Sequence, residues 1–260
     1  MAGTAFNFEL RTLRKRMNIQ HSTLNFQRST VFGKGPPPQA TDNCQPSTVN
    51  FPSPVNRQLS IGILGGAFDP VHNGHLEMAR AAMEECGLNR VIFIPAAISP
   101  FKTDGPIVGA SDRLEMLNRA ITGFPDYEIS KIELDRKEIS YTIDTIRELH
   151  KEYGPKAELY LIIGMDNILA IAGWKDIELL IEKCRFIIIT RPEFEIGELT
   201  REDKYWTDKI MDSGRGSILS RHIPVSSTAI RAAIREGKEI SAQVPDGVRS
   251  YIIEKGLYRN

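Results

Sequence analysis

The chain has 260 residues, enough for one large or two small domains, and its 41% hydrophobic content can supply a sizeable core. Its 33 Lys and Arg residues balance 33 Asp and Glu residues, so its composition does not indicate a nucleic-acid-binding protein. Since no apolar run approaches the roughly 18 residues of a membrane-spanning helix, no membrane partner is expected. Three cysteines without CxxC spacing predict a reducing compartment and therefore a cytoplasmic core.

The first 57 residues differ in composition from the rest. They are rich in Ser, Thr, Asn, Gln and Pro and lack a sustained hydrophobic period, and residues 1–58 contain seven Lys and Arg against two Asp and Glu. We expect 1–57 to be mostly disordered and 58–260 to form the folded domain. An organelle transit segment and a plain unstructured leader are both compatible with this composition.

From residue 59 onward, strand and helix patterns alternate. The expected strands are 59–64, 91–94, 127–134, 159–163, 186–190 and 218–225, and the expected helices are 76–86, 111–121, 142–153, 176–183, 228–236 and 246–254. This alternation predicts a Rossmann-like, doubly wound α/β fold with a mainly parallel sheet and helices on both faces. The polar segment 193–216 is expected to be an excursion or flexible insert. Asp112, Arg113 and Glu115 are expected on a solvated helix face.

The most informative segment joins the first strand to the first helix and reads GGAFDPVHNGH, residues 65–75. A strand, a glycine-rich turn and a helix start place backbone N–H groups where they can meet phosphate oxygens. His72 and His75 add side-chain donors at the same helix end, and Gly74 permits close approach of the backbone. Metal ligation by the two histidines and a purely structural turn are the alternatives, but no further ligand set is apparent, so no metal site is predicted. Asp69 and Pro70 are expected to shape the turn.

Three other segments also follow expected strands. They are 95–102, 164–166 and 226–231, with the sequences PAAISPFK, GMD and SSTAIR. Ligands of open α/β sheets bind beyond the carboxyl ends of the strands, so we expect these segments to converge on one site. Taken alone, residues 226–231 form an ordinary helix N-cap.

Segment 65–75 resembles the HxGH motif of the nucleotidyltransferase superfamily, and its longer form GGxFDPxHxGH is similar to that of bacterial nicotinate-mononucleotide adenylyltransferases. Residues 226–231 resemble the superfamily's SSTxIR element, and residues 140–145, SYTIDT, resemble the family's SYTxDT element. The resemblance spans 61–257. It departs at 99–102, where SPFK replaces the common PPHK, and at Glu138, where the family often has glycine.

The resemblance implies adenylyl transfer from ATP to nicotinate mononucleotide, giving deamido-NAD and pyrophosphate in NAD biosynthesis, with Mg²⁺ accompanying ATP. It implies catalytic roles for His72, His75 and Arg231. The implied ATP-binding residues are Gly65, Gly66, Phe68, Lys102, Gly164, Asp166, Ser227 and Thr228, and the implied pyridine-nucleotide-binding residues are Tyr141, Thr142 and Trp174. Trp174 has a second interpretation, as a core tryptophan beside Ile171 and Ile177.

Alternatives remain at the level of function. The same chemistry on nicotinamide mononucleotide or another phosphorylated acceptor is one, and a non-catalytic nucleotide-binding regulator is another. The helix start at Thr142 favours the acid over the amide because its positive end attracts a carboxylate. The expected partners are small-molecule substrates, and the sequence leaves a homo-oligomer open.

Overall fold

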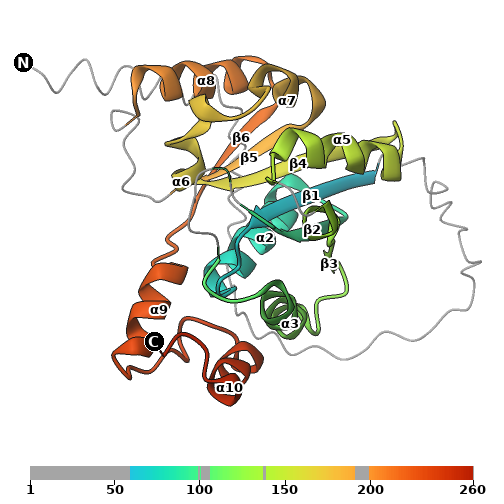
Figure 1. Cartoon of the computed structure of the whole chain (residues 1–260). Helices are drawn as coiled ribbons and strands as arrows, with labels where there is room; N and C mark the ends of the chain where they lie inside the picture. The colour runs from blue at the N-terminus through green and yellow to red at the C-terminus, as the bar shows by residue number, and fades with distance from the viewer. Residues whose placement is uncertain (1–58, 99, 101–105, 137–138, 191–198, 260) are drawn as a thin grey trace, which may run out of the picture. The chain divides into compact units, whose positions relative to one another are not determined.

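The computed structural model describes residues 59–98, 100, 106–136, 139–190 and 199–259 (Figure 1). The predicted leader and Lys102 lie outside these residues. Six strands form one parallel sheet in the order β3-β2-β1-β4-β5-β6. Their bounds are β1 (Leu59–Gly66), β2 (Arg90–Pro95), β3 (Tyr127–Ile129), β4 (Ala157–Gly164), β5 (Arg185–Thr190) and β6 (Gly216–Ser220). The predicted Rossmann-like α/β fold is confirmed.

Helices cover both faces of this sheet (Figure 1). They are α2 (Asn73–Cys86), α3 (Ala110–Ile121), α4 (Ile132–Arg136), α5 (Thr142–Tyr153), α6 (Met165–Ile168), α7 (Ile177–Lys183), α8 (Arg201–Asp212), α9 (Ser227–Arg235), α10 (Asp246–Lys255) and the 3₁₀ turn η1 (Ile171–Gly173). Within the described residues, no helix combines the length and the apolar character needed to cross a membrane.

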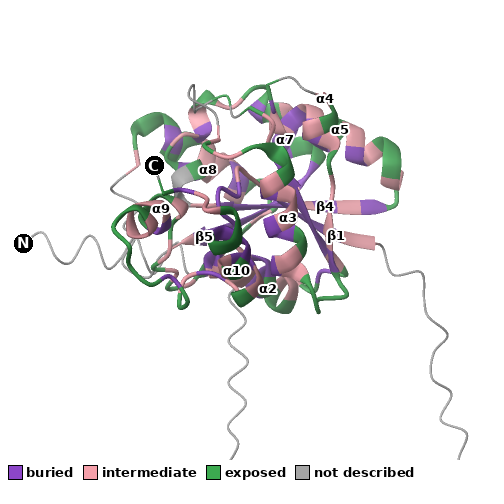
Figure 2. Cartoon of the chain, turned by 60° about the horizontal axis from the view of Figure 1, so that its bottom comes forward, coloured by how far each residue is buried: buried purple, intermediate pink, exposed green. Residues whose placement is uncertain are grey.

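Alternate side chains of the strands point to opposite faces and build two apolar layers. On one face, strand residues such as Phe93 and Ile187 pack with α2, α3, α9 and α10. On the other face, Ile63 and Ile188 pack with α5, α7 and α8. In Figure 2 the buried residues follow the sheet and the inner sides of the helices, while exposed residues lie outside. Because both faces are covered, the strands are nearly continuous apolar runs.

Two predicted strands were too long. The strand expected over 127–134 ends at Ile129, and α4 begins at Ile132, whose N–H donates to the Ser130 hydroxyl at 3.4 Å. The strand expected over 218–225 ends at Ser220, with one further ladder bond from Arg221 N–H to the Thr190 carbonyl at 2.8 Å. Its neighbour β5 also ends at Thr190, and Pro224 has no N–H for a ladder.

The interpretation of 193–216 as an excursion or flexible insert was wrong for residues 201–212, which form α8. Thr200 caps this helix, since its hydroxyl accepts from the Asp203 N–H at 3.1 Å and donates to the Asp203 carboxylate at 2.7 Å. Asp203 is buried and its other carboxylate oxygen accepts from the Ala172 N–H at 3.2 Å. A helix with many charges therefore still docks, because Ile210 and the capping residues face inward.

Candidate active site

Residues 65–75, here called the histidine turn, follow β1 at the point where the strand order of the sheet reverses. Strand β1 pairs with β2 on one side and with β4 on the other, so the loops after β1 and β4 leave the sheet in different directions. Gly65 and Gly66 end β1, and Gly164 ends β4. A Cβ on Gly164 would meet Met78 of α2 at 3.6 Å, so the end of β4 lies beside the helix that follows the turn.

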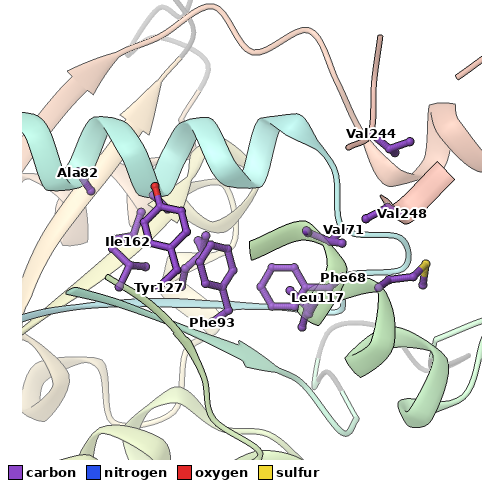
Figure 3. Close-up of a cluster of buried hydrophobic side chains, with 14 of the residues drawn as sticks. Phe68, Val71, Ala82, Phe93, Leu117, Tyr127, Ile162, Val244 and Val248 are labelled. Carbon is purple, nitrogen blue, oxygen red and sulfur yellow. The ribbon is translucent and has the colours of Figure 1, made fainter. Parts of the chain in front are cut away.

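Two apolar residues of the turn anchor it in the core. Phe68 is 1% exposed and Val71 is fully buried, and both belong to the cluster that includes Leu117 and Val248 (Figure 3). Phe68 has a φ of 49°, a backbone conformation unusual for a non-glycine residue. Its ring lies edge-on to His75 with centroids 4.9 Å apart. The turn is therefore held at both sides of Asp69–Pro70, whose peptide bond is cis.

His72 and His75 begin α2 as its N-cap and third residue. Their rings stack with centroids 3.7 Å apart, and His75 Nδ1 accepts a hydrogen bond from the His72 N–H at 3.2 Å. Since Nδ1 is an acceptor, the neutral His75 ring has its proton on Nε2. The half-buried His75 thus carries a donor at the positive end of α2.

Burial sets the charge of His72. The residue is 7% exposed, and desolvation lowers its pKa from 6.5 to about 4. At neutral pH His72 is an uncharged imidazole.

This shift predicts a pH dependence of stability. Between pH 6.5 and 4 the unfolded chain protonates His72 while the folded chain does not, so the unfolding free energy falls as the pH falls through this interval. We expect this group to contribute about 2–3 kcal/mol of the decrease. Chemical denaturation across this pH range should show a shallower decrease for His72→Gln than for the wild type. Parallel curves for the two proteins would contradict a neutral, buried His72.

Position 74 needs a glycine because the His72 side chain lies against it. A Cβ at this position would lie 2.9 Å from His72 Nδ1 and 2.7 Å from Ile223 Cγ2. Any larger residue must displace the imidazole or the segment that precedes α9. In the structure, the groups that approach the Gly74 backbone closely are the side chains of His72 and Ile223.

Helix α9 brings the third candidate catalytic residue to the turn. Arg231 Nη1 donates to the Asp69 carbonyl at 2.7 Å, and Nη2 donates to Thr228 Oγ1 at 3.3 Å. The Ser227 hydroxyl donates to the Pro70 carbonyl at 2.9 Å. Ser226 is the N-cap, with its side chain accepting from the Ala229 N–H at 3.2 Å. Residues 226–231 therefore form the N-cap of α9 and also contact the histidine turn.

A chain of hydrogen bonds connects the end of β1 to the SYTIDT segment. The Ala96 N–H donates to the Gly66 carbonyl at 2.9 Å, and the Ala97 N–H donates to Ser140 Oγ at 3.0 Å. The Ser140 N–H in turn donates to the Ile98 carbonyl at 2.9 Å. These bonds place the start of α5, where Tyr141 is the N-cap and Thr142 the first helical residue, beside the chain that follows β1 and β2.

A cavity of about 650 Å³ opens beside the first turns of α5. Lys175 Nζ lies 4.6 Å from the ring centroid of Tyr141 and donates to Asp144 Oδ2 at 2.8 Å. That hydrogen bond is the main reason why the pKa of Asp144 is lowered. The cavity is lined by these three residues together with Ile98, Arg136, Ile139, Arg147, Glu148 and Lys151.

Trp174 immediately precedes Lys175 and follows η1. It is half-buried and packs against the cluster that contains Ile171 and Ile177, as its interpretation as a core tryptophan requires. Its indole N–H is buried, and within the described part of the chain it has no hydrogen-bond partner. Among the other predicted site residues, Lys102 lies outside the described residues, and so does the side chain of Asp166.

The expectation of a solvated Arg113 was wrong. Arg113 is 2% exposed, and its Nη1 donates to the Ala67 carbonyl at 2.8 Å and to the Ala96 carbonyl at 2.9 Å. Burial lowers the pKa of Arg113, and the charge of Asp69 opposes that shift. Tyr258 was also missed from the sequence, and its hydroxyl donates a hydrogen bond to the Asp69 carboxylate. Neither residue lies in a motif, and their only signal was the apolar spacing around them.

An all-parallel sheet of order 3-2-1-4-5-6, with an HxGH turn at its switch point and an SSTxIR helix docked on that turn, defines a nucleotidyltransferase. The family described as "Cytidylyltransferase-like" matches residues 63–233. A protein from Moorella thermoacetica named "Probable nicotinate-nucleotide adenylyltransferase" is 41% identical over 79% of this chain and 94% of its own length. A protein of the same name from Desulfitobacterium hafniense is 38% identical over 81% of this chain and its full length. The chain belongs to the nicotinate-nucleotide adenylyltransferase family.

Solved structures share the fold. The Plasmodium falciparum nicotinic acid mononucleotide adenylyltransferase complexed with NaAD has a TM-score of 0.62 and 21% identity, covering 77% of this chain and 97% of that one. The same Plasmodium enzyme complexed with APC has a TM-score of 0.61 and 20% identity, with the same coverage.

Proposed function

We propose that this chain transfers the adenylyl group of ATP to nicotinate mononucleotide, forming deamido-NAD and releasing pyrophosphate in NAD biosynthesis. The observation that carries the proposal is the stacked pair His72 and His75 at the start of α2, held against Arg231 of α9 through the intervening turn. The 5′-phosphate oxygen of the mononucleotide attacks the α-phosphorus of ATP, and the bond to the pyrophosphate oxygen breaks. No protein nucleophile is needed.

Charge stabilisation is the main task of the protein in this reaction. His75, with its proton on Nε2, donates to the α-phosphoryl oxygens, and His72 and the Gly74 N–H lie at the same end of the helix, where the Asn73 N–H donates to the Gln243 carbonyl. Arg231 uses donors on two of its nitrogens within the protein, and its remaining N–H groups are assigned to the leaving pyrophosphate. The Thr228 hydroxyl and the backbone N–H of Ser227 are assigned to the same group, since the Ser227 hydroxyl donates to the Pro70 carbonyl.

The ATP-dependent reaction of this family uses a divalent metal, and we assign Mg²⁺. Mg²⁺ prefers oxygen ligands and retains several waters. Within the described residues no group of three or more His, Cys, Asp or Glu side chains could hold a metal ion. The phosphate oxygens of ATP and water are therefore its proposed ligands, and the ion neutralises phosphate charge when it is bound.

The pyridine end is assigned to the start of α5. The N–H groups of the first turn, at Thr142 and Ile143, suit a carboxylate because they have no acceptor within the helix and lie at its positive end, whereas the Tyr141 N–H donates to the Ile139 carbonyl at 3.1 Å. Lys175 adds a positive charge over the Tyr141 ring. Trp174, with its unpartnered indole N–H among the described residues, is the proposed contact of the pyridine ring.

The assignment of activity is tested by pyrophosphate release from purified protein with ATP and Mg²⁺, comparing nicotinate and nicotinamide mononucleotides. We expect a strong preference for the acid. Equal rates would keep the reaction and contradict recognition of the carboxylate at α5. Release with neither acceptor would contradict the proposed function.

The pyridine contact is tested with the two tryptophans of the chain. Loss of an aromatic stack in Trp174→Leu is expected to raise KM for the mononucleotide roughly three- to tenfold and to leave KM for ATP unchanged. Trp206→Leu is the matched control, because Trp206 lies on α8 and contacts Lys209 and Tyr205. Equal effects of the two variants would argue for a purely structural role of Trp174.

A further inference from the structure

The histidine turn is closed by residues from the far end of the chain. The buried carboxylate of Asp69 accepts from the Tyr258 hydroxyl at 2.7 Å through Oδ1 and from the Ile107 N–H at 2.7 Å through Oδ2. Asp69 is 4% exposed and Tyr258 is 6% exposed. Asp69 precedes His72 by three residues, so only Pro70 and the fully buried Val71 separate the two in the chain.

The path of the chain after α10 brings Tyr258 to this position. Gly256 ends the helix with a φ of 63°, and the Leu257 N–H donates back to the Ile252 carbonyl at 3.0 Å. Tyr258 itself has a φ of 64°, which a bulky residue adopts only when its surroundings hold it there. A strained backbone and a buried hydroxyl are therefore both maintained to place one donor on Asp69.

A buried carboxylate costs stability unless it is well paired, and an apolar replacement often folds at least as well. Asp69 shares its surroundings with Arg113, which feels its charge while binding the carbonyls of Ala67 and Ala96. Arg231 and Ser227 bind the carbonyls of Asp69 and Pro70 from a third element. Hydrogen bonds from α9 and from Tyr258 thus converge on the two residues before Val71, and Arg113 of α3 holds the nearby Ala67 carbonyl.

We propose that Tyr258 is a positioning residue for adenylyl transfer, acting through its hydrogen bond to Asp69 to hold His72 and His75 in place. This assignment rests on the proposed function for its kinetic consequence. Its structural consequence, the placement of the two imidazoles, does not depend on which acceptor the enzyme uses. Tyr258 remains a donor at all working pH values, because burial and the neighbouring carboxylate raise its pKa.

The chain offers a matched control. Tyr251 lies on α10, is 7% exposed, and donates its hydroxyl to Asp112 Oδ1 of α3 at 2.9 Å. Tyr251→Phe and Tyr258→Phe therefore remove the same group from the same kind of bond, but only the second bond ends on the histidine turn. A merely structural role would give both variants the same behaviour.

Two readouts test the proposal. In Tyr258→Phe, kcat is expected to fall about tenfold with KM for both substrates within a factor of about two, because a small misplacement of catalytic groups affects the transition state most. The imidazole NMR signals of His72 and His75 are expected to shift in Tyr258→Phe and to remain unchanged in Tyr251→Phe. Asp69→Asn, which alters the other end of the bond, is expected to reproduce both changes.

Unmoved His72 and His75 signals in Tyr258→Phe would overturn the proposal, as would an equal loss of kcat in Tyr251→Phe. If Tyr258→Phe fails to fold, Asp69→Asn decides by the same two readouts. The NMR readout needs no turnover. Shifted histidine signals in a protein that releases no pyrophosphate would uphold the positioning role and reject the proposed function, so that the two failures are distinguishable.

Discussion

His75→Asn is expected to lower kcat by about 10²–10³ with little change in the folded structure. The Asn side chain can still present an acceptor to the His72 N–H, the bond that His75 Nδ1 makes at 3.2 Å. It has no group at the position of Nε2, where His75 offers its proton to the phosphoryl oxygens. Steady-state pyrophosphate release and a thermal unfolding curve measure the two effects separately.

His75→Gln is the matched control for this experiment. Its longer amide reaches toward the Nε2 position and gives up the bond to the His72 backbone. We therefore expect His75→Gln to retain more kcat than His75→Asn while losing more stability. The reverse order of kcat would mean that His75 acts by holding the turn, and a kcat within a few-fold of wild type in both variants would remove His75 from catalysis.

Arg113→Met is expected to lower the free energy of unfolding by about 3–5 kcal/mol, the largest stability effect that we expect in this chain. The substitution leaves the Ala67 and Ala96 carbonyls without their charged donor and removes one of the positive charges near the buried Asp69 carboxylate, another being Arg231. Chemical denaturation measures the change. Arg119→Met is the control from the same helix, since Arg119 pairs with Glu115 at the surface, and we expect a much smaller loss.

A double variant tests the electrostatic part of this loss. Asp69→Asn removes the carboxylate charge that Arg113→Met leaves with less compensation. The double variant is therefore expected to be more stable than the sum of the two single changes implies. Strict additivity would show that Arg113 stabilises the fold through its carbonyl contacts alone.

Much of the fold could be predicted because the strands and helices carry strong local signals. Helix α5 was predicted at its observed bounds, since Gly154 takes a φ of 75° and its N–H closes the helix on the His150 carbonyl. The end of strand β3 and the whole of helix α8 could not be predicted, because they depend on tertiary partners. Helix α4 begins at Ile132, just after the pairing of β3 with the sheet ends. The sequence of Arg201–Asp212 is mostly polar, yet the helix packs on the domain through its Thr200 cap and the buried Ile210.

The candidate site was predicted where motifs carry it. His72, His75 and Arg231 are joined through the turn that sequence reasoning singled out. Arg113 and Tyr258 were missed, because a buried Arg on a helix reads like a solvated one and a Tyr near the chain end reads like core. Only tertiary contacts with Asp69 and its neighbours distinguish them. The roles of Arg113 and Tyr258, like those of the motif residues, are predictions that the variants described above test.

The dependence of the turn on late segments has a consequence for the order of events during synthesis. Asn73, at the first position of α2, donates its N–H to the Gln243 carbonyl at 2.9 Å and its side-chain amide to the Ala242 carbonyl at 3.1 Å. A growing chain on the ribosome contains the histidines about 170 residues before these partners emerge. In the nascent protein Asn73 therefore lacks these two acceptors until residues 242–243 have been synthesised, so the histidine turn is expected to reach its final arrangement late in synthesis.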